Sequence, residues 1–252
     1  MKIAPMLAAI ALAPAVFAAG TADAAEVRVL ASTAIKTALE ALAPQFEMAS
    51  GHKLVITYGA SGRLQPEIEK GLAFDLAILS TSVTDALVKQ GRLVAATRID
   101  IARSGAGVAV RTGTPRPDIS TPESFKRALL AARTLGYSET GAAGQFLISM
   151  FQRLGIAEEM KPKLKLARPN QPSLQALADG EIDIGIPQIS EALVFPGVDL
   201  VGPLPPELQV YTVLPAAVGT NAQSPDAAKA LLKFLAAPAA ISVLKAKGLE
   251  PG

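Results

Sequence analysis

The stretch "YGASGRLQPEIEKG", residues 58–71, decides the fold, because an apolar segment ends in it and a helix is predicted to begin. The preceding "KLVITY" favours a β-strand, and "RLQPEIEKG" favours a short helix that ends at Gly71. Gly59, Ala60, Ser61 and Gly62 join the two segments. Such short side chains leave backbone N–H groups accessible, and a helix N-terminus carries about half a positive charge. The turn is therefore predicted to bind an anion.

Strand-like and helix-like segments alternate on both sides of this turn. Strands are predicted over 26–32, 52–58 and 74–80, with helices over 34–50 and 82–91. Pro44 is expected to kink or split the first helix. This alternation is typical of an open α/β sheet with mostly parallel strands.

A second series of similar size follows residue 120. Its first helix is predicted to start at a capping box of Ser120 and Glu123, and further strands are predicted over 134–138, 163–167 and 181–188. Two series predict two lobes joined by a hinge of two crossover strands, near 103–109 and 210–217. We expect one lobe over 25–104 plus 213–252, which includes the last two helices, and the other over 105–212.

The first 24 residues are predicted to be a cleaved signal sequence. Lys2 is followed by an apolar stretch and an A-x-A arrangement at Ala22 to Ala24. The chain has no Cys, so no lipidated cysteine or disulfide is expected, and we predict a soluble periplasmic protein without a lipid anchor. The net charge of +2 without a basic run argues against nucleic acid or an anionic membrane as partner. With one His and no Cys, no metal site or cofactor is predicted.

Polar residues recur where predicted strands end. In open α/β sheets, ligands bind beyond the carboxyl ends of the strands. Each such residue alone is more often a turn former or helix cap than a ligand, and the signal is their recurrence in both lobes. The candidates read from these turns are Ser32, Thr33, Ala34, Ser61, Arg63, Ser80 to Ser82, Ser138 to Gly144, Pro169 to Gln171 and Gln188. Arg103 joins them because it lies at the predicted hinge.

The pieces "YGASGRLQPEIEKG", "FDLAILS", "GYSETGAAGQFLISMFQRLG" and "GEIDIGIPQ" resemble the periplasmic molybdate-binding proteins of bacterial ABC importers. The resemblance covers nearly the whole chain after residue 26. It implies a two-lobed periplasmic binding protein of type II that closes on a small anion held by neutral donors. It also implies an inner-membrane ABC permease as partner, a monomer, and no enzymatic activity.

The resemblance places the ligand contacts of the family by position. The serine of the second turn corresponds to Ser61, whereas the serine of the first turn corresponds to Ala34, beside Ser32 and Thr33. The contacts of the second lobe correspond to Ala143 and Asn170, and the tyrosine of the family is replaced by Gln188. Because two side-chain donors differ, an organic carboxylate is as credible a ligand as molybdate or tungstate. Arg63 and Arg103 would suit a carboxylate held by two hydrogen bonds.

Two other functions stay open. A secreted serine hydrolase could use Ser61 as nucleophile, but His52 is the only candidate base and lies at the opposite end of the same predicted strand. The other alternative is a periplasmic sensor or interaction module on the same scaffold, because fold does not fix function.

Overall fold

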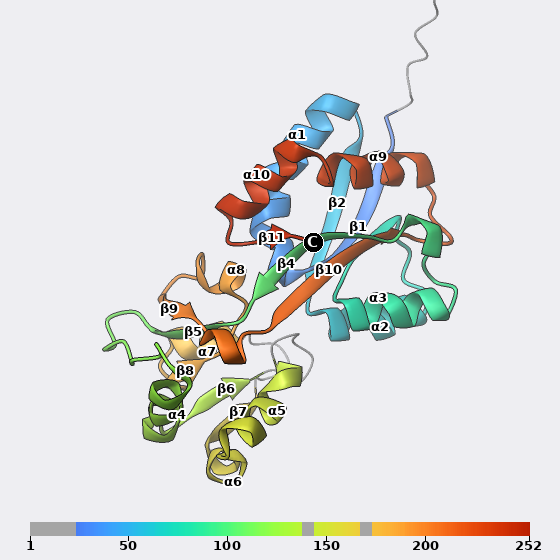
Figure 1. The fold of residues 1–252 in the computed structure, drawn as a ribbon. Helices are drawn as coiled ribbons and strands as arrows, with labels where there is room; N and C mark the ends of the chain where they lie inside the picture. The colour runs from blue at the N-terminus through green and yellow to red at the C-terminus, as the bar shows by residue number, and fades with distance from the viewer. Residues whose placement is uncertain (1–23, 138–143, 167–172) are drawn as a thin grey trace, which may run out of the picture.

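The computed structural model describes residues 24–137, 144–166 and 173–252, which form two sheets with helices packed around each (Figure 1). The first sheet has six strands in the order β11-β4-β10-β3-β1-β2, and the second has five in the order β7-β6-β8-β5-β9. β1, β2 and β3 are parallel, as are β6, β7 and β8. The predicted two-lobed α/β fold is confirmed, but both sheets are mixed rather than mostly parallel, because β10 and β11 pair antiparallel in the first sheet and β5 does so in the second.

Each predicted strand overlaps an observed one, but β3 and β8 are shorter than predicted, with three and two residues. The strands of the first sheet are β1 (Glu26–Ser32), β2 (Lys53–Gly59), β3 (Leu76–Ile78), β4 (Ile99–Gly105), β10 (Tyr211–Val218) and β11 (Glu250–Pro251). Those of the second sheet are β5 (Gly107–Arg111), β6 (Leu135–Tyr137), β7 (Leu164–Leu166), β8 (Ile184–Gly185) and β9 (Val198–Pro203).

Helices cover both faces of the first sheet. Those of the first lobe are η1 (Thr33–Ile35), α1 (Lys36–Ser50), α2 (Ser61–Glu69), α3 (Thr81–Lys89), η2 (Ala95–Thr97), α9 (Pro225–Leu235) and α10 (Pro238–Ala246). Those of the second are α4 (Pro122–Ala131), α5 (Gly144–Leu154), α6 (Ala157–Met160), η3 (Lys161–Lys163), α7 (Ser173–Ala178), α8 (Ile189–Ala192) and η4 (Pro206–Leu208). As expected, the last two helices pack against α1 of the first lobe (Figure 1).

β1 lies inside the first sheet and is buried on both faces. Val27, Val29 and Ala31 belong to the core shared with α1, α9 and α10, whereas Leu30 belongs to the core shared with α2 and α3. A central strand covered on both faces reads as a nearly continuous apolar run, which explains "VRVLA". The position of β1 between β3 and β2 fixes where its carboxyl end meets the turns after those strands.

The chain crosses between the sheets twice. β4 of the first sheet runs into β5 of the second at residues 105–107, and the chain returns from β9 through η4 to β10. β10 pairs antiparallel with both β3 and β4, so the two crossing strands lie side by side. These crossings lie near the predicted hinge; the division into 25–104 plus 213–252 and 105–212 stays a prediction.

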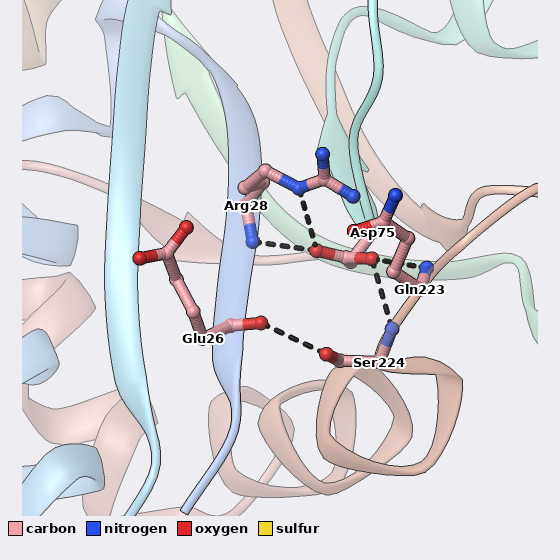
Figure 2. A network of polar contacts seen from close by, with 5 residues as sticks. All are labelled: Glu26, Arg28, Asp75, Gln223 and Ser224. Atoms are coloured by element: carbon pink, nitrogen blue, oxygen red, sulfur yellow. Dashed lines mark hydrogen bonds and ion pairs between the residues drawn. The ribbon is translucent and has the colours of Figure 1, made fainter.

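A buried carboxylate ties the returning chain to the first lobe (Figure 2). Asp75 is fully buried; its Oδ2 accepts from the backbone N–H and Nε of Arg28 at 2.8 and 3.3 Å. Its Oδ1 accepts from the N–H groups of Gln223 and Ser224 at 2.6 and 3.1 Å. The Ser224 hydroxyl donates to the carbonyl of Glu26 at 2.9 Å. One side chain thus connects β1, the segment before β3, and the entry to α9.

Two local expectations meet a different outcome. α1 runs through Pro44 without splitting. α4 is capped by Thr121 rather than Ser120, because Thr121 accepts from the N–H of Ser124, whose side chain accepts from the N–H of Thr121. The predicted capping box of Ser120 and Glu123 is therefore wrong by one residue. Asp118 instead engages the Ser120 side chain.

Within the described part of the chain, no single helix has the length and apolar composition to cross a membrane. α9 and α10 reach that threshold together, but they are bent by 67° relative to each other. The predicted signal sequence falls on residues 1–23, outside the described residues, apart from Ala24.

Candidate functional site

The first turn of the candidate site follows β1. Ser32 ends the strand, and its Oγ accepts from the backbone N–H of Ala34 at 3.3 Å, which caps η1. Ser32 and Ala34 are buried, whereas Thr33 is exposed. The Thr33 hydroxyl donates to Oε1 of Glu191 at 2.5 Å, so its hydrogen is already used within the protein.

The second turn lies beside the first, because Gly59 at the end of β2 pairs with Ser32 at the end of β1. Ser61 is the first residue of α2 and is buried. Its Oγ accepts from the backbone N–H of Ser80 at 3.0 Å, which leaves the hydroxyl hydrogen to donate elsewhere. Since β1 lies between β2 and β3 in the sheet, this bond links two turns across the end of β1. The helical start at Ser61 supplies free N–H groups at the same place.

The third turn leads from β3 into α3 and borders an open hollow between the lobes. The hollow has a volume of about 390 Å³ and is lined by Ser80 to Ser82, by Phe146 and Ser149 of α5, and by residues 210–213. Hydroxyl groups alternate there with aromatic and aliphatic surface. A small organic anion with a carbon skeleton would find both kinds of contact in it.

Gln188 follows β8 of the second sheet and contacts the crossing strand β10. It is 4 % exposed, and its Nε2 donates to Oγ1 of Thr212 in β10 at 3.1 Å. No protein partner for its Oε1 is found among the described residues. Because a buried amide oxygen without a partner is costly, Gln188 has unused hydrogen-bonding capacity beside the crossing strands.

α8 directly follows Gln188 and contacts the first turn. Ser190 Oγ donates to the carbonyl of Ala34 at 2.7 Å and lies 3.1 Å from Ser104 Oγ of β4. Burial raises the pKa of Glu191, although hydrogen bonds from Thr33 and from the backbone of Gln188 oppose that rise. The sequence reasoning did not include Ser190, Glu191 or Ser104. The available signal was two polar residues at the helix start after a predicted strand.

The two arginines predicted for the site both have hydrogen-bond partners within the protein. Arg63 is exposed, and one of its guanidinium nitrogens donates to the carbonyl of Tyr58 at 3.1 Å. Arg103 donates twice to Oε2 of Glu250, at 2.9 and 2.6 Å, and stacks on the ring of Tyr211.

The register of the crossing strands separates Arg103 from Gln188. Arg103 pairs with Val213, and the next pair along is Ser104 with Thr212. Directly paired residues share one face of a sheet and successive residues alternate. Arg103 and Tyr211 therefore lie on the face opposite Ser104 and Thr212, which contact Ser190 and Gln188.

The structure thus brings together Ser32, Thr33 and Ala34 with Gln188 near the hinge, and places Ser61 beside them at the strand ends. Ala143 and Asn170, predicted to face them from the second lobe, lie outside the described residues. Their assignment, like the other ligand contacts, stays a prediction.

The geometry speaks against nucleophilic catalysis by Ser61. His52 and Ser61 flank opposite ends of the seven-residue strand β2, a separation of about 20 Å at ~3.3 Å per residue. The Nδ1 of His52 instead accepts from the backbone N–H of Ala25 at 3.2 Å. Among the described residues, no group of three His, Cys, Asp or Glu side chains could hold a metal ion.

Comparison with known proteins agrees with this architecture. The family model "Bacterial extracellular solute-binding protein" matches residues 27–250. The aconitate isomerase of Pseudomonas sp is 33% identical over 228 residues, covering 88% of this chain and 87% of its own. The molybdate-binding protein ModA of Azotobacter vinelandii is 25% identical over 232 residues, 90% of each chain.

A solved structure shows the same fold. The periplasmic molybdate-binding protein of Azotobacter vinelandii superposes with a TM-score of 0.76 at 19% identity, covering 90% of this chain and 99% of its own. The family match over residues 27–250 shows that this chain belongs to the bacterial extracellular solute-binding proteins.

Proposed function

We propose that the protein is the periplasmic solute-binding component of an ABC importer and captures a small anion between its lobes. The observation that carries the proposal is the convergence of three turns at one sheet edge. There the Ser61 hydroxyl and the N-termini of α2 and α3 are held together by the bond from the Ser80 N–H to Ser61 Oγ. Helix N-termini and hydroxyl donors suit an anion without requiring a positive side chain.

Because both candidate arginines already have partners within the protein, we expect neutral donors to make the principal contacts with the anion. Arg63 and Arg103 are both engaged within the protein, with a carbonyl and with Glu250. Relatives of the chain are named as molybdate-binding proteins, which supports an oxyanion. The mixed polar and apolar lining of the hollow supports a small carboxylate. A shared ligand class, a small multiply charged anion, accommodates both.

A thermal-shift screen tests the proposal. The mature protein is heated with molybdate, tungstate, sulfate, phosphate, citrate or aconitate, each at millimolar concentration. An anion at a hundred times its dissociation constant stabilises by about 2.7 kcal/mol, which is a readily measured shift. A protein that no anion of the panel stabilises, but that retains a protein partner in a pull-down, would instead fit the sensor or interaction module.

A second candidate function is favoured by one relative. The relative named aconitate isomerase is 33% identical, against 25% and 26% for the two named as molybdate-binding ModA. We therefore also propose that the cleft binds an unsaturated polycarboxylate such as aconitate, and that it interconverts the isomers. Proton NMR of cis-aconitate incubated with the protein tests this directly. Appearance of trans-aconitate would support catalysis. Binding of cis-aconitate without its conversion would support the function of a solute-binding protein alone.

A further inference from the structure

The first turn of the candidate site is held from the opposite lobe. Two successive residues of the turn each bond to one of two successive residues of α8. The carbonyl of Ala34 accepts from Ser190 Oγ at 2.7 Å, and the Thr33 hydroxyl donates to Glu191 at 2.5 Å. These partners are more than 150 residues apart in sequence, at separations of 156 and 158. The orientation of peptide groups in the turn therefore depends on where the second lobe lies.

The same contacts reach the crossing strands. Ser190 Oγ lies 3.1 Å from the hydroxyl of Ser104 in β4, and both serines are almost completely buried. Ser104 pairs with Thr212 on the adjacent strand β10, and the Thr212 hydroxyl accepts a hydrogen bond from Gln188. A rotation about β4 and β10 must consequently alter the spacing between α8 and the first turn. We call Thr33, Ala34, Ser104, Ser190 and Glu191 the interlobe seam.

Among the residues that the structure describes, no cationic side chain forms an ion pair with Glu191. The charged side chains on the strands packed against α8 are Asp100 and Arg103 on β4, Arg111 on β5 and Asp199 on β9. Lys36 follows η1, and Lys247 precedes Gly248, which lies against Ile189 and Ser190. Asp100 pairs with Arg98 at 3.1 Å. Lys36 pairs with Glu40, Arg103 with Glu250, and Asp199 with Thr112 and Arg116, while Arg111 lies over Gly180. Burial raises the pKa of the Glu191 carboxyl, and hydrogen bonds with Thr33 and the backbone of Gln188 lower it. An ionised Glu191 would therefore place an uncompensated negative charge beside a turn proposed to bind anions.

We propose that Ser190 and Glu191 are positioning residues that set the first ligand-binding turn from the opposite lobe and so couple the lobe angle to anion affinity. The lobe-angle part of this proposal does not depend on which ligand binds. The affinity part rests on the proposed anion-binding function.

The lobe angle is measured without ligand. Because the chain has no Cys, Met48→Cys on α1 and Glu159→Cys on α6 give two exposed sites for spin labels, one on each lobe. Ser190→Ala and Glu191→Ala are added to this pair, with Ser242→Ala and Glu67→Gln as exposed controls. We expect the interlobe distance distribution to shift or broaden in the two seam variants and to stay unchanged in the controls. Distributions that coincide with the parent in folded seam variants would overturn the proposal.

The affinity is measured with molybdate by calorimetry between pH 5 and pH 8. As the pH rises, ionisation of Glu191 adds negative charge, so wild-type affinity should fall at least threefold more than that of Glu191→Gln. The glutamine retains an acceptor for Thr33, so it should keep the turn in place and flatten the pH profile. Ser190→Ala should bind molybdate about tenfold more weakly than the wild type, with the same dependence of affinity on pH. If Ser190 and Glu191 had a purely structural role, their variants would lower Tm without changing the affinity or its dependence on pH.

The outcomes separate the two proposals. If the wild type binds molybdate and all variants share its affinity and pH slope, anion binding stands and the positioning role is wrong. If the wild type binds none of the six anions in the screen, the anion-binding function is wrong, and the spin-label distances alone decide whether Ser190 and Glu191 set the lobe angle.

Discussion

Replacing Asp75 with asparagine tests whether one buried carboxylate holds the returning chain on the first lobe. The substitution keeps the size of the side chain but converts one of its two acceptor oxygens into a donor. In the native protein each oxygen accepts two hydrogen bonds, Oδ2 from Arg28 and Oδ1 from Gln223 and Ser224 (Figure 2). Whichever way the amide turns, its NH₂ group faces N–H donors.

The loss of stability follows from these contacts. At least one buried backbone N–H loses its acceptor, at about 1–3 kcal/mol, and the charged bond with Arg28 contributes about 1.5–3 kcal/mol. Arg28 is 26% exposed, so water compensates part of its loss. We expect Asp75→Asn to lower the free energy of unfolding by about 3–5 kcal/mol, the range measured when one partner of a buried ion pair is removed.

Urea unfolding followed by circular dichroism measures this difference. Asp85→Asn is the matched control, because Asp85 is 57% exposed and pairs with Arg98 at 3.0 Å. An exposed pair of this kind contributes about 0–1 kcal/mol. A loss for Asp75→Asn as small as that of the control, with an unchanged dependence on urea, would refute the reasoning.

The same carboxylate predicts an acid limb of stability. Burial alone would raise the pKa of Asp75, but hydrogen bonds from Arg28, Ser224 and Gln223 outweigh it and hold the pKa below its ordinary value. Because the folded pKa is lower than the unfolded pKa of about 3.9, the ionised carboxylate stabilises the protein fully above the unfolded pKa. This stabilisation is lost as the pH falls toward the folded pKa. The stability of Asp75→Asn should therefore depend less on pH below about 4 than that of the wild type.

Three further predictions concern the site and the sheet. Ser61→Ala removes the acceptor of the Ser80 N–H and a hydroxyl donor, so anion affinity by calorimetry should fall about tenfold or more, against no change for Ser242→Ala. Arg103→Gln should change that affinity less than threefold, because the Arg103 guanidinium already donates twice to Glu250; a loss as large as that of Ser61→Ala would instead mean that Arg103 contacts the ligand. Gly219→Ala should destabilise by about 1–3 kcal/mol in urea, since its Cβ would lie 3.0 Å from the Phe74 carbonyl, whereas Gly202→Ala, with 3.7 Å to its nearest neighbour, should not.

Local patterns were sufficient to predict most of the fold. β1 was predicted over its observed range because a nearly continuous apolar run, interrupted only by Arg28, marks a strand buried on both faces. Helix ends at Gly71, Gly91 and Gly155 were predictable because each glycine has a positive φ, which few other residues adopt. The cap of α4 was misplaced by one residue because Ser120 and Thr121 are both good caps, and the Ser120 hydroxyl bonds to Asp118 instead.

The candidate site was less predictable, because its geometry depends on contacts between distant segments. The sequence identifies Ser61 and Gln188 as polar residues at strand ends, but it does not contain the bonds to Ser80 and Thr212 that orient them. The sequence also placed Arg103 near the hinge, but it could not give the strand register that puts Arg103 on the face opposite Ser104.

Ser104, the neighbour of Arg103, faces the second lobe instead. A serine in an apolar strand carries little signal by itself, and its meaning arises only from Ser190, 86 residues away. If the ligand site is shared by the two lobes, as proposed, the residues that set it are those whose partners lie in the other lobe. Periodicity identifies the elements within each lobe, whereas the seam between the lobes depends on the register of two crossing strands. That register follows from the packing of both sheets, and no single stretch of the sequence encodes it.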